Sequence, residues 1–403
     1  MNSYTHSNER KQSGPVPIVY VGIGFSVISL ALGIIIGISA LAENNGFSLN
    51  NGIAADITFH PDLMVFGVIG GLLITEKLEL MEKFSLFGYF RISRMIVSLL
   101  FSGVFISSAG IWLQISAMQD LGLLLVAAAS ILFLYYMTSR RNPGMAYVKH
   151  VSGAAILGMF LSAIANLNQF ITESNELTYL VLLFPVVYVL AERMELGYIR
   201  GMKVSFIRTQ SILSWILVIT AFLSVEINVG PFPRLLMLTS IAILIFLVVG
   251  SVYFDPSFRH LIKKNRLQSY IQKGIVISYL WLFLGIILFI MQAILGHGFL
   301  DPAAHSIALG FIGTFIVAHS PIIFPLTLKK KAVQENVTLL PIIIITVANF
   351  MRIFGDISLH YLWISAAISY ASAYVLLVAI IAFVYNLRRI MYIGAPKNSV
   401  EVG

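Results

Sequence analysis

Long apolar runs alternate with short polar connections along almost the whole chain of 403 residues. A helix of about twenty apolar residues is long enough to cross the hydrocarbon core of a membrane. Twelve such runs lie at residues 17–42, 61–75, 92–116, 120–138, 151–171, 175–191, 210–226, 232–254, 272–295, 302–328, 339–358 and 361–387. The pattern predicts an all-α membrane protein with twelve transmembrane helices in a single domain, residues 17–387, between polar tails at residues 1–16 and 388–403.

Positive charge marks one side of the predicted helices. All but two of the 26 lysines and arginines fall in every second connection, at residues 10–11, 77–94, 140–149, 193–208, 259–273, 329–331 and 388–397. The other connections carry mainly acidic residues. Because lysine and arginine concentrate on the cytoplasmic side of membrane proteins, we expect a multi-pass protein of the plasma membrane with both termini in the cytoplasm.

Composition agrees with this class and excludes several others. Apolar residues make up 58% of the chain and charged residues 11%, and the mean hydropathy is +0.90. Cysteine is absent, which excludes disulfides, iron–sulfur clusters and thiolate metal sites. The net charge of +8 follows from the cytoplasmic basic residues, so the expected partner is a lipid bilayer and not nucleic acid.

A short internal echo joins two predicted helix ends. The second helix ends in TEKLEL, residues 75–80, and the sixth ends in AERMEL, residues 191–196. The copies are four helices apart, which predicts three four-helix units around a pseudo-threefold axis. The alternative is a chance match, because cytoplasmic helix ends favour charged residues.

Two histidines stand at the outer starts of helices that run inward. His60 precedes Pro61 at the second helix, and Asp301 and Pro302 predict the start of the tenth helix just before His305. Ionisable residues in a membrane segment are costly and mark functional sites. Two imidazoles at matching depth could ligate one haem iron; the alternative is that each is only a hydrogen-bonded buried histidine.

Four further residues belong to this candidate site or compete with it. Met64, one turn after His60, is an alternative iron ligand. Arg352, in the eleventh helix, either forms a one-turn ion pair with Asp356 or, with Arg234, binds an anionic ligand group. His319 precedes a proline by two residues, so it either binds the carbonyl that the proline frees or ligates a second group. Glycines near the two histidines would let a macrocycle or a neighbouring helix approach closely: Gly67, Gly70, Gly71, Gly310 and Gly313.

Three stretches resemble the NnrS family. Residues His60–Gly67 follow its second-helix pattern H-x-x-x-M-x-F-G, and His305–Thr314 follow its tenth-helix pattern H-x-x-x-x-G-x-I-G-T. Ala348–Arg352 and Tyr361–Trp363 match a third patch. The resemblance implies a twelve-helix, haem-containing, nitric-oxide-associated membrane protein, similar in plan to the core subunit of haem–copper oxidases. It further implies one b-type haem between His60 and His305, with its propionates paired to Arg352 and Arg234.

The sequence also departs from that family and from the oxidases. Asp62 stands where the family usually has another histidine, and Glu192–Glu195 replaces a basic G-R motif. The sixth and seventh helices contain no histidine, so copper is not expected, and neither is an oxygen-reducing terminal oxidase. With copper and oxygen reduction set aside, the resemblance implies nitric-oxide-related redox chemistry, sensing or protection, or electron transfer with a redox partner protein.

Two other classes of function stay open. A twelve-helix secondary transporter has the same number of helices and the same topology, but its repeat is expected at six helices, and no buried carboxylate for proton coupling stands out in the sequence. A haem-free accessory subunit is the third alternative.

Overall fold

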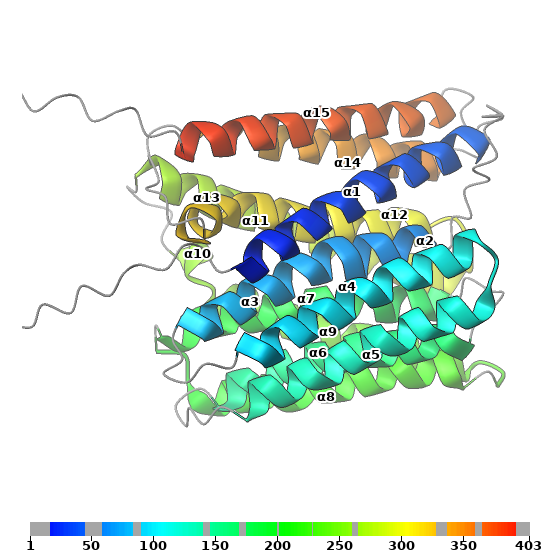
Figure 1. The fold of residues 1–403 in the computed structure, drawn as a ribbon, viewed down its shortest axis with the longest axis horizontal. Helices are drawn as coiled ribbons and strands as arrows, with labels where there is room; N and C mark the ends of the chain where they lie inside the picture. Colours follow the sequence, from blue (N-terminus) through cyan, green and yellow to red (C-terminus); the bar gives the residue numbers. More distant parts are fainter. Residues whose placement is uncertain are drawn as a thin grey trace, which may run out of the picture.

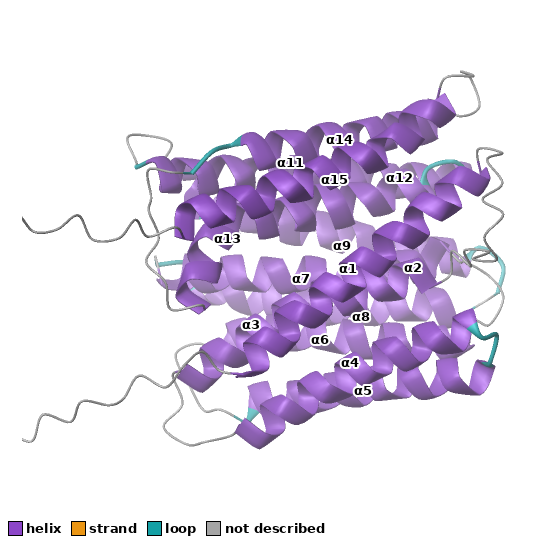
Figure 2. Cartoon of the chain, turned by 45° about the horizontal axis from the view of Figure 1, so that its top comes forward, coloured by secondary structure: helices purple, strands orange, loops and turns teal. Residues whose placement is uncertain are grey.

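A computed structural model of the chain describes residues 17–44, 59–83, 90–139, 146–168, 175–199, 201–227, 229–259, 265–327, 337–358 and 365–391. These residues form helices joined by short turns and contain no strand. Figure 1 shows the long helices running side by side along one direction, and Figure 2 shows the described turns, in teal, at the two ends of the bundle. The all-α class expected from the sequence is therefore correct.

Most of the predicted segments appear as single helices. They are α1 (Pro17–Asn44), α4 (Phe90–Trp112), α5 (Ser116–Thr138), α6 (Ala146–Asn168), α7 (Asn175–Ile199), α8 (Val204–Glu226), α9 (Phe232–Phe254), α11 (Arg266–Leu295), α14 (Leu340–Ser358) and α15 (Ser365–Met391). A short helix, α10 (Pro256–Arg259), lies between α9 and α11. Because α15 extends to Met391, the predicted C-terminal tail begins inside a helix.

The second and tenth predicted helices are composite. The second consists of α2 (Phe59–Pro61), the π-helix η1 (Asp62–Gly70) and α3 (Gly71–Lys83), which follow one another without a break. The tenth consists of α12 (Leu300–His305), the π-helix η3 (Ser306–Gly313) and α13 (Thr314–Thr327). A π-helix is wider than an α-helix, is rare, and occurs frequently at functional sites.

Eleven helices in the described part of the chain are long and apolar enough to cross a membrane. The composite helix Phe59–Lys83 is not among them, and it carries Asp62, Glu76, Lys77 and Glu79. Large apolar side chains cover the outside of the bundle, among them Ile35, Tyr135, Phe246 and Ile381. An apolar exterior of this kind suits the acyl chains of a bilayer, so the molecule is a polytopic membrane helical bundle.

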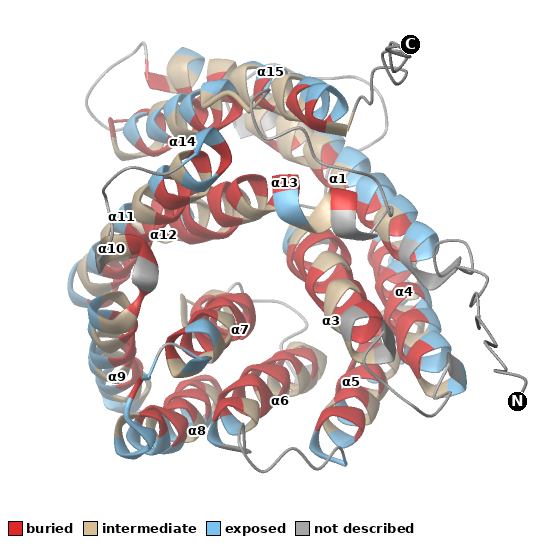
Figure 3. Cartoon of the chain, turned by 90° about the vertical axis from the view of Figure 1, so that its left-hand side faces the viewer, coloured by how far each residue is buried: buried red, intermediate tan, exposed pale blue. Residues whose placement is uncertain are grey.

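Helices that follow one another along the chain pack side by side, among them α4 with α5, α5 with α6, α8 with α9 and α14 with α15. Contacts of α9 with α11 and of α1 with α15 close the arrangement into a ring. Figure 3 looks along the bundle and shows α7 on the inside of this ring.

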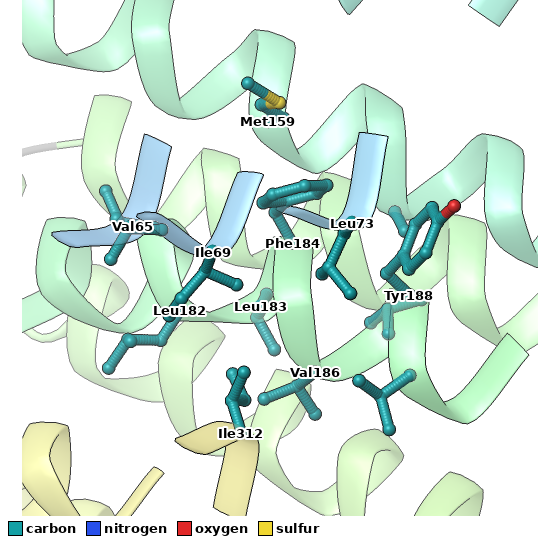
Figure 4. Close-up of a cluster of buried hydrophobic side chains, with 14 of the residues drawn as sticks. Val65, Ile69, Leu73, Met159, Leu182, Leu183, Phe184, Val186, Tyr188 and Ile312 are labelled. Carbon is teal, nitrogen blue, oxygen red and sulfur yellow. The ribbon is translucent and has the colours of Figure 1, made fainter. Parts of the chain in front are cut away.

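The core is centred on α7, which contacts both π-helices. Figure 4 shows this cluster of buried side chains, to which η1, α3, α6, α7 and η3 all contribute. Its labelled members are Val65, Ile69, Leu73, Met159, Leu182, Leu183, Phe184, Val186, Tyr188 and Ile312. The second and tenth predicted helices are thereby held in fixed positions on either side of α7.

Candidate functional site

His60 stands at the start of its composite helix and is covered by α1. Its Nδ1 lies 2.9 Å from the carbonyl oxygen of Gly33. A Cβ atom on Gly37 would lie 3.1 Å from the imidazole, so the missing side chain there makes room for the ring. Since a carbonyl can only accept, Nδ1 carries the proton, and the lone pair of the neutral ring is on Nε2.

His305 is anchored in the same way at the start of the tenth helix. Its Nδ1 lies 3.0 Å from the carbonyl oxygen of Asp301 and 3.0 Å from the carboxylate of the same residue. Both partners are acceptors, so Nδ1 is again the protonated nitrogen. The helix begins at Leu300, within one residue of the start predicted from Asp301 and Pro302, and the Asp301 carboxylate accepts a hydrogen bond from Arg352.

Figure 1 shows α2 (Phe59–Pro61) and α12 (Leu300–His305), which carry the two histidines, at the same end of the bundle. His60 is close enough to His305, Asp301 and Arg352 for electrostatic interaction with all three. Within the described part of the chain, neither ring forms a hydrogen bond through Nε2. A histidine that binds a metal characteristically donates its other ring N–H to a carbonyl or carboxylate, and both rings have this arrangement.

Arg352 neutralises two carboxylates beside His305. Its Nη2 lies 2.5 Å from Asp301, and its Nε lies 2.9 Å from Asp356, in a close ion pair without the alignment of a hydrogen bond. Its Nη1 donates to Ser369 at 3.2 Å, and Ser369 in turn donates to Asp356 at 2.7 Å. The predicted one-turn ion pair is thus present, and it extends across α12, α14 and α15.

The remaining predicted site residues lie outside this group. Arg234 is exposed at the start of α9, which packs against α7, α8 and α11. Met64 packs its sulfur against Gly33 of α1. Neighbouring helices occupy the space beside Gly67 and Gly310. A Cβ atom would lie 2.7 Å from Ser29 at Gly67 and 2.7 Å from Trp281 at Gly310.

His319 belongs to a second buried group, near the other end of the bundle. Arg193 binds both carboxylate oxygens of Asp255 at 2.6 Å, donates to Ser257 at 3.0 Å and lies 3.3 Å from Nε2 of His319. Because arginine only donates, Nε2 is the acceptor and Nδ1 donates to the carbonyl oxygen of Phe315 at 3.0 Å. Both nitrogens of His319 are therefore used.

This arrangement corrects the interpretation of His319 from the sequence. Pro321 frees the carbonyl of Val317, one turn earlier. That carbonyl accepts hydrogen bonds from Tyr270 at 3.0 Å and from Ser320 at 2.8 Å, and His319 does not bind it. The alternative role as a ligand to a second group also conflicts with the contact between Nε2 and Arg193.

Sequence reasoning missed the buried carboxylates. Asp62 is 7% exposed and accepts a hydrogen bond from Ser107 at 3.3 Å, and Glu79 is 2% exposed. The expectation that no buried carboxylate stands out is therefore wrong. The echo could have indicated buried carboxylates, because its acidic residues lie inside α3 and α7 and not in the connections that follow them. Its two copies meet through an ion pair of Lys77 with Glu195 at 3.0 Å.

These features define a polytopic helical membrane protein with two histidines near one end and buried charged groups near both ends. A family model described as a domain of unknown function (DUF8744) matches residues 24–387, and the chain belongs to this family. A comparison with curated proteins gives no match.

Proposed function

We propose that this DUF8744 protein is a haem-binding integral membrane protein in which His60 and His305 are the axial ligands of one b-type haem. The observation that carries the proposal is the shared anchoring of the two rings. Each donates Nδ1–H to a backbone carbonyl or carboxylate, and each retains Nε2 as its ligand atom. The donor set fits haem iron, for which two neutral imidazoles are common axial ligands.

In this proposal the residues around the histidines hold and orient the ligands. The carbonyl of Gly33 fixes the ring of His60, and Asp301 fixes that of His305. Asp301 is in turn held by Arg352, which also provides positive charge for haem propionates. A haem in this position would supply one-electron chemistry, or would bind a small gas if one axial ligand were displaced.

The wider plan of the molecule supports the same proposal. The two copies of the echo meet through the ion pair of Lys77 with Glu195, which a pseudo-threefold arrangement of four-helix units would explain. The NnrS resemblance assigns such a protein to nitric-oxide-related redox chemistry, sensing or protection, or to electron transfer with a redox partner. We propose this role, without copper and without oxygen reduction.

An absorption spectrum of the purified protein tests the proposal. With two imidazole ligands, the reduced protein should show sharp low-spin haem bands that carbon monoxide changes little. His60→Ala and His305→Ala should each abolish these bands or leave a high-spin species that binds carbon monoxide. His319→Ala should keep them, because both nitrogens of His319 are bound within the protein.

His297→Ala is a matched control, since His297 is exposed on the connection that precedes α12. A low-spin spectrum that survives either ligand substitution would show that the pairing is wrong. A colourless parent protein, after expression with adequate haem supply, would reject the haem proposal.

The buried carboxylates favour a secondary transporter as the second candidate. Asp62 and Glu79 lie in a helix that is irregular over residues 62–70, and irregular membrane helices with buried acids are typical of carriers. Uptake of labelled solutes into vesicles in response to a proton gradient, by a colourless protein, would favour this candidate.

A further inference from the structure

A buried glutamine joins three segments at the end of the bundle where α2 and α12 lie. Gln292 stands in the last turn of α11 and is 3% exposed. Its Nε2 donates to Oδ1 of Asn175, the first residue of α7, at 2.9 Å. Its Oε1 accepts from the backbone N–H of Phe299, directly before α12, at 2.8 Å. One side-chain amide therefore holds α7, α11 and the start of α12 together.

The orientation of this amide follows from the peptide group that it meets. A backbone N–H can only donate, so the oxygen of Gln292 faces Phe299. Its nitrogen then faces Asn175, which accepts with its own side-chain oxygen. Both polar ends of the amide are used. Loss of the side chain would leave the N–H of Phe299 without this partner, which is costly for a group that water reaches poorly.

The connection between α11 and α12 has little packing of its own. Residues 294–298 are exposed. Gly296 and Gly298 both have a φ of 84°, in the left-handed region that favours glycine, and an added Cβ atom would meet nothing within 4 Å at either position. The first fixed point after this exposed segment is Phe299, and Gln292 provides it.

The ring of His305 depends on α12 for its orientation. Its Nδ1 lies 3.0 Å from both the carbonyl oxygen and the carboxylate of Asp301, so the ring is fixed to the first turn of α12. The backbone N–H of Ala303 donates to the carbonyl oxygen of Phe299 at 2.9 Å, which ties this turn to the residue that Gln292 holds. A movement of Phe299 would therefore be passed on to the imidazole.

The next turn of α7 and α11 gives the amide a firm base. Tyr179 and Phe289 lie one turn deeper than Asn175 and Gln292, and both are fully buried. Their ring centroids are 5.2 Å apart, with the edge of one ring against the face of the other. Because α7 also contacts both π-helices, it is the common support of the two helices that carry His60 and His305.

We propose that Gln292 is a positioning residue for the axial ligand His305, which it holds at a fixed place relative to α7 through Phe299 and α12. The inference rests on the proposed haem site and adds to it a residue that touches neither the iron nor its ligands. Hydrogen-bonded groups outside the ligands themselves orient those ligands and tune the metal.

Electron paramagnetic resonance of the ferric protein tests this role, because the g values of a low-spin haem depend on the orientation of its two axial imidazoles. In Gln292→Leu we expect the largest g value to shift and haem to transfer to apomyoglobin several-fold faster than from the parent. Gln292→Glu should restore both properties. A carboxylate oxygen can accept from the N–H of Phe299, and Asn175 can turn its amide to donate to the other oxygen.

Gln272→Leu is the matched control. Gln272 lies at the opposite end of α11, is 6% exposed and donates to the carbonyl oxygen of Ser257. Its loss also removes a hydrogen bond of a buried glutamine, but should leave the g values and the transfer rate unchanged. Unchanged g values in Gln292→Leu, or an equal shift in Gln272→Leu, would overturn the proposal. If Gln292→Leu does not fold, Asn175→Leu decides: it keeps the bond to Phe299, so a smaller shift is expected, and no shift would overturn the proposal.

Amide hydrogen exchange separates failure of this inference from failure of the haem proposal. Exchange in the peptide that contains Phe299 should be several-fold faster in Gln292→Leu than in the parent and unchanged in Gln272→Leu, with or without haem. A colourless protein with this difference would reject the haem proposal and retain Gln292 as the anchor of α12. A protein with low-spin haem bands but without the difference would retain the haem and reject the inference, and a colourless protein without it would reject both.

Discussion

At the scale of single residues, two arginines within the bundle organise its polar interior. Arg193 is 5% exposed, and its partner Asp255 is fully buried. Arg352 holds Asp301 and Asp356 together beside His305. Arg193 binds both oxygens of Asp255, and Arg352 reaches two carboxylates with different nitrogens. The forked guanidinium group allows both arrangements, whereas the single ammonium group of lysine does not.

Removal of one partner of the Arg193–Asp255 ion pair is expected to destabilise the protein more than removal of both partners. Asp255→Ala leaves a buried cation uncompensated and should destabilise the protein by about 3–5 kcal/mol. The double substitution Arg193→Ala/Asp255→Ala should cost less, because no unpaired charge remains. Thermal unfolding in detergent measures the difference, with the exposed substitution Glu226→Ala as the control. Equal losses from the single and double variants would show that charge compensation is not what the pair provides.

Arg352 is expected to affect haem retention without supplying an iron ligand. Arg352→Ala should weaken retention by about 1–3 kcal/mol, because a propionate and two protein carboxylates would lose their cation. The haem content of the purified variant measures this. Comparison with Arg352→Ala/Asp356→Ala separates the loss of the cation for the haem from the effect of leaving Asp356 without its ion-pair partner. If both variants retain haem as the parent does, Arg352 has no propionate role.

At the scale of helices, small residues set the closest contacts. The pair α4 and α5 packs through Gly103, Gly110 and Gly122. A Cβ atom on Gly122 would lie 2.2 Å from the backbone nitrogen of Ser107, which no side-chain rotation can relieve. Small residues at such interfaces are how membrane helices approach one another, because lipid provides no hydrophobic drive for association.

Gly122→Ala should therefore force α4 and α5 apart. We expect a loss of about 1–3 kcal/mol, since overpacking of a tight contact must be relieved by moving backbone. The matched control is Gly24→Ala in α1, where an added Cβ atom meets nothing within 4 Å. Thermal unfolding of the two variants compares them. Equal stability would mean that the α4–α5 contact is looser than the structure indicates.

At the scale of the whole molecule, the distribution of lysine and arginine fixes the expected orientation. Reporters fused after Gly403 or within residues 139–149 should read as cytoplasmic, and those within residues 43–56 or 296–301 as external. Activity of paired reporters, one active only inside the cell and one only outside, measures this. A cytoplasmic reading for residues 43–56 together with an external reading for residues 296–301 would place His60 and His305 on different sides and remove the basis of their pairing.

The sequence by itself determined the class, the approximate helices and their alternation of direction. These properties are local, because apolar runs and flanking charges act on each segment separately, and so His60 and His305 could be assigned to matching helix starts. The structure alone supplied the contacts between distant segments. Arg193 and Asp255 are 62 residues apart, and Lys77 and Glu195 are 118 apart. No pattern in either segment names its partner, since a buried charge requires compensation from whichever helix the packing brings alongside. The same holds for Nε2 of His319, because its partner Arg193 is 126 residues away in the chain.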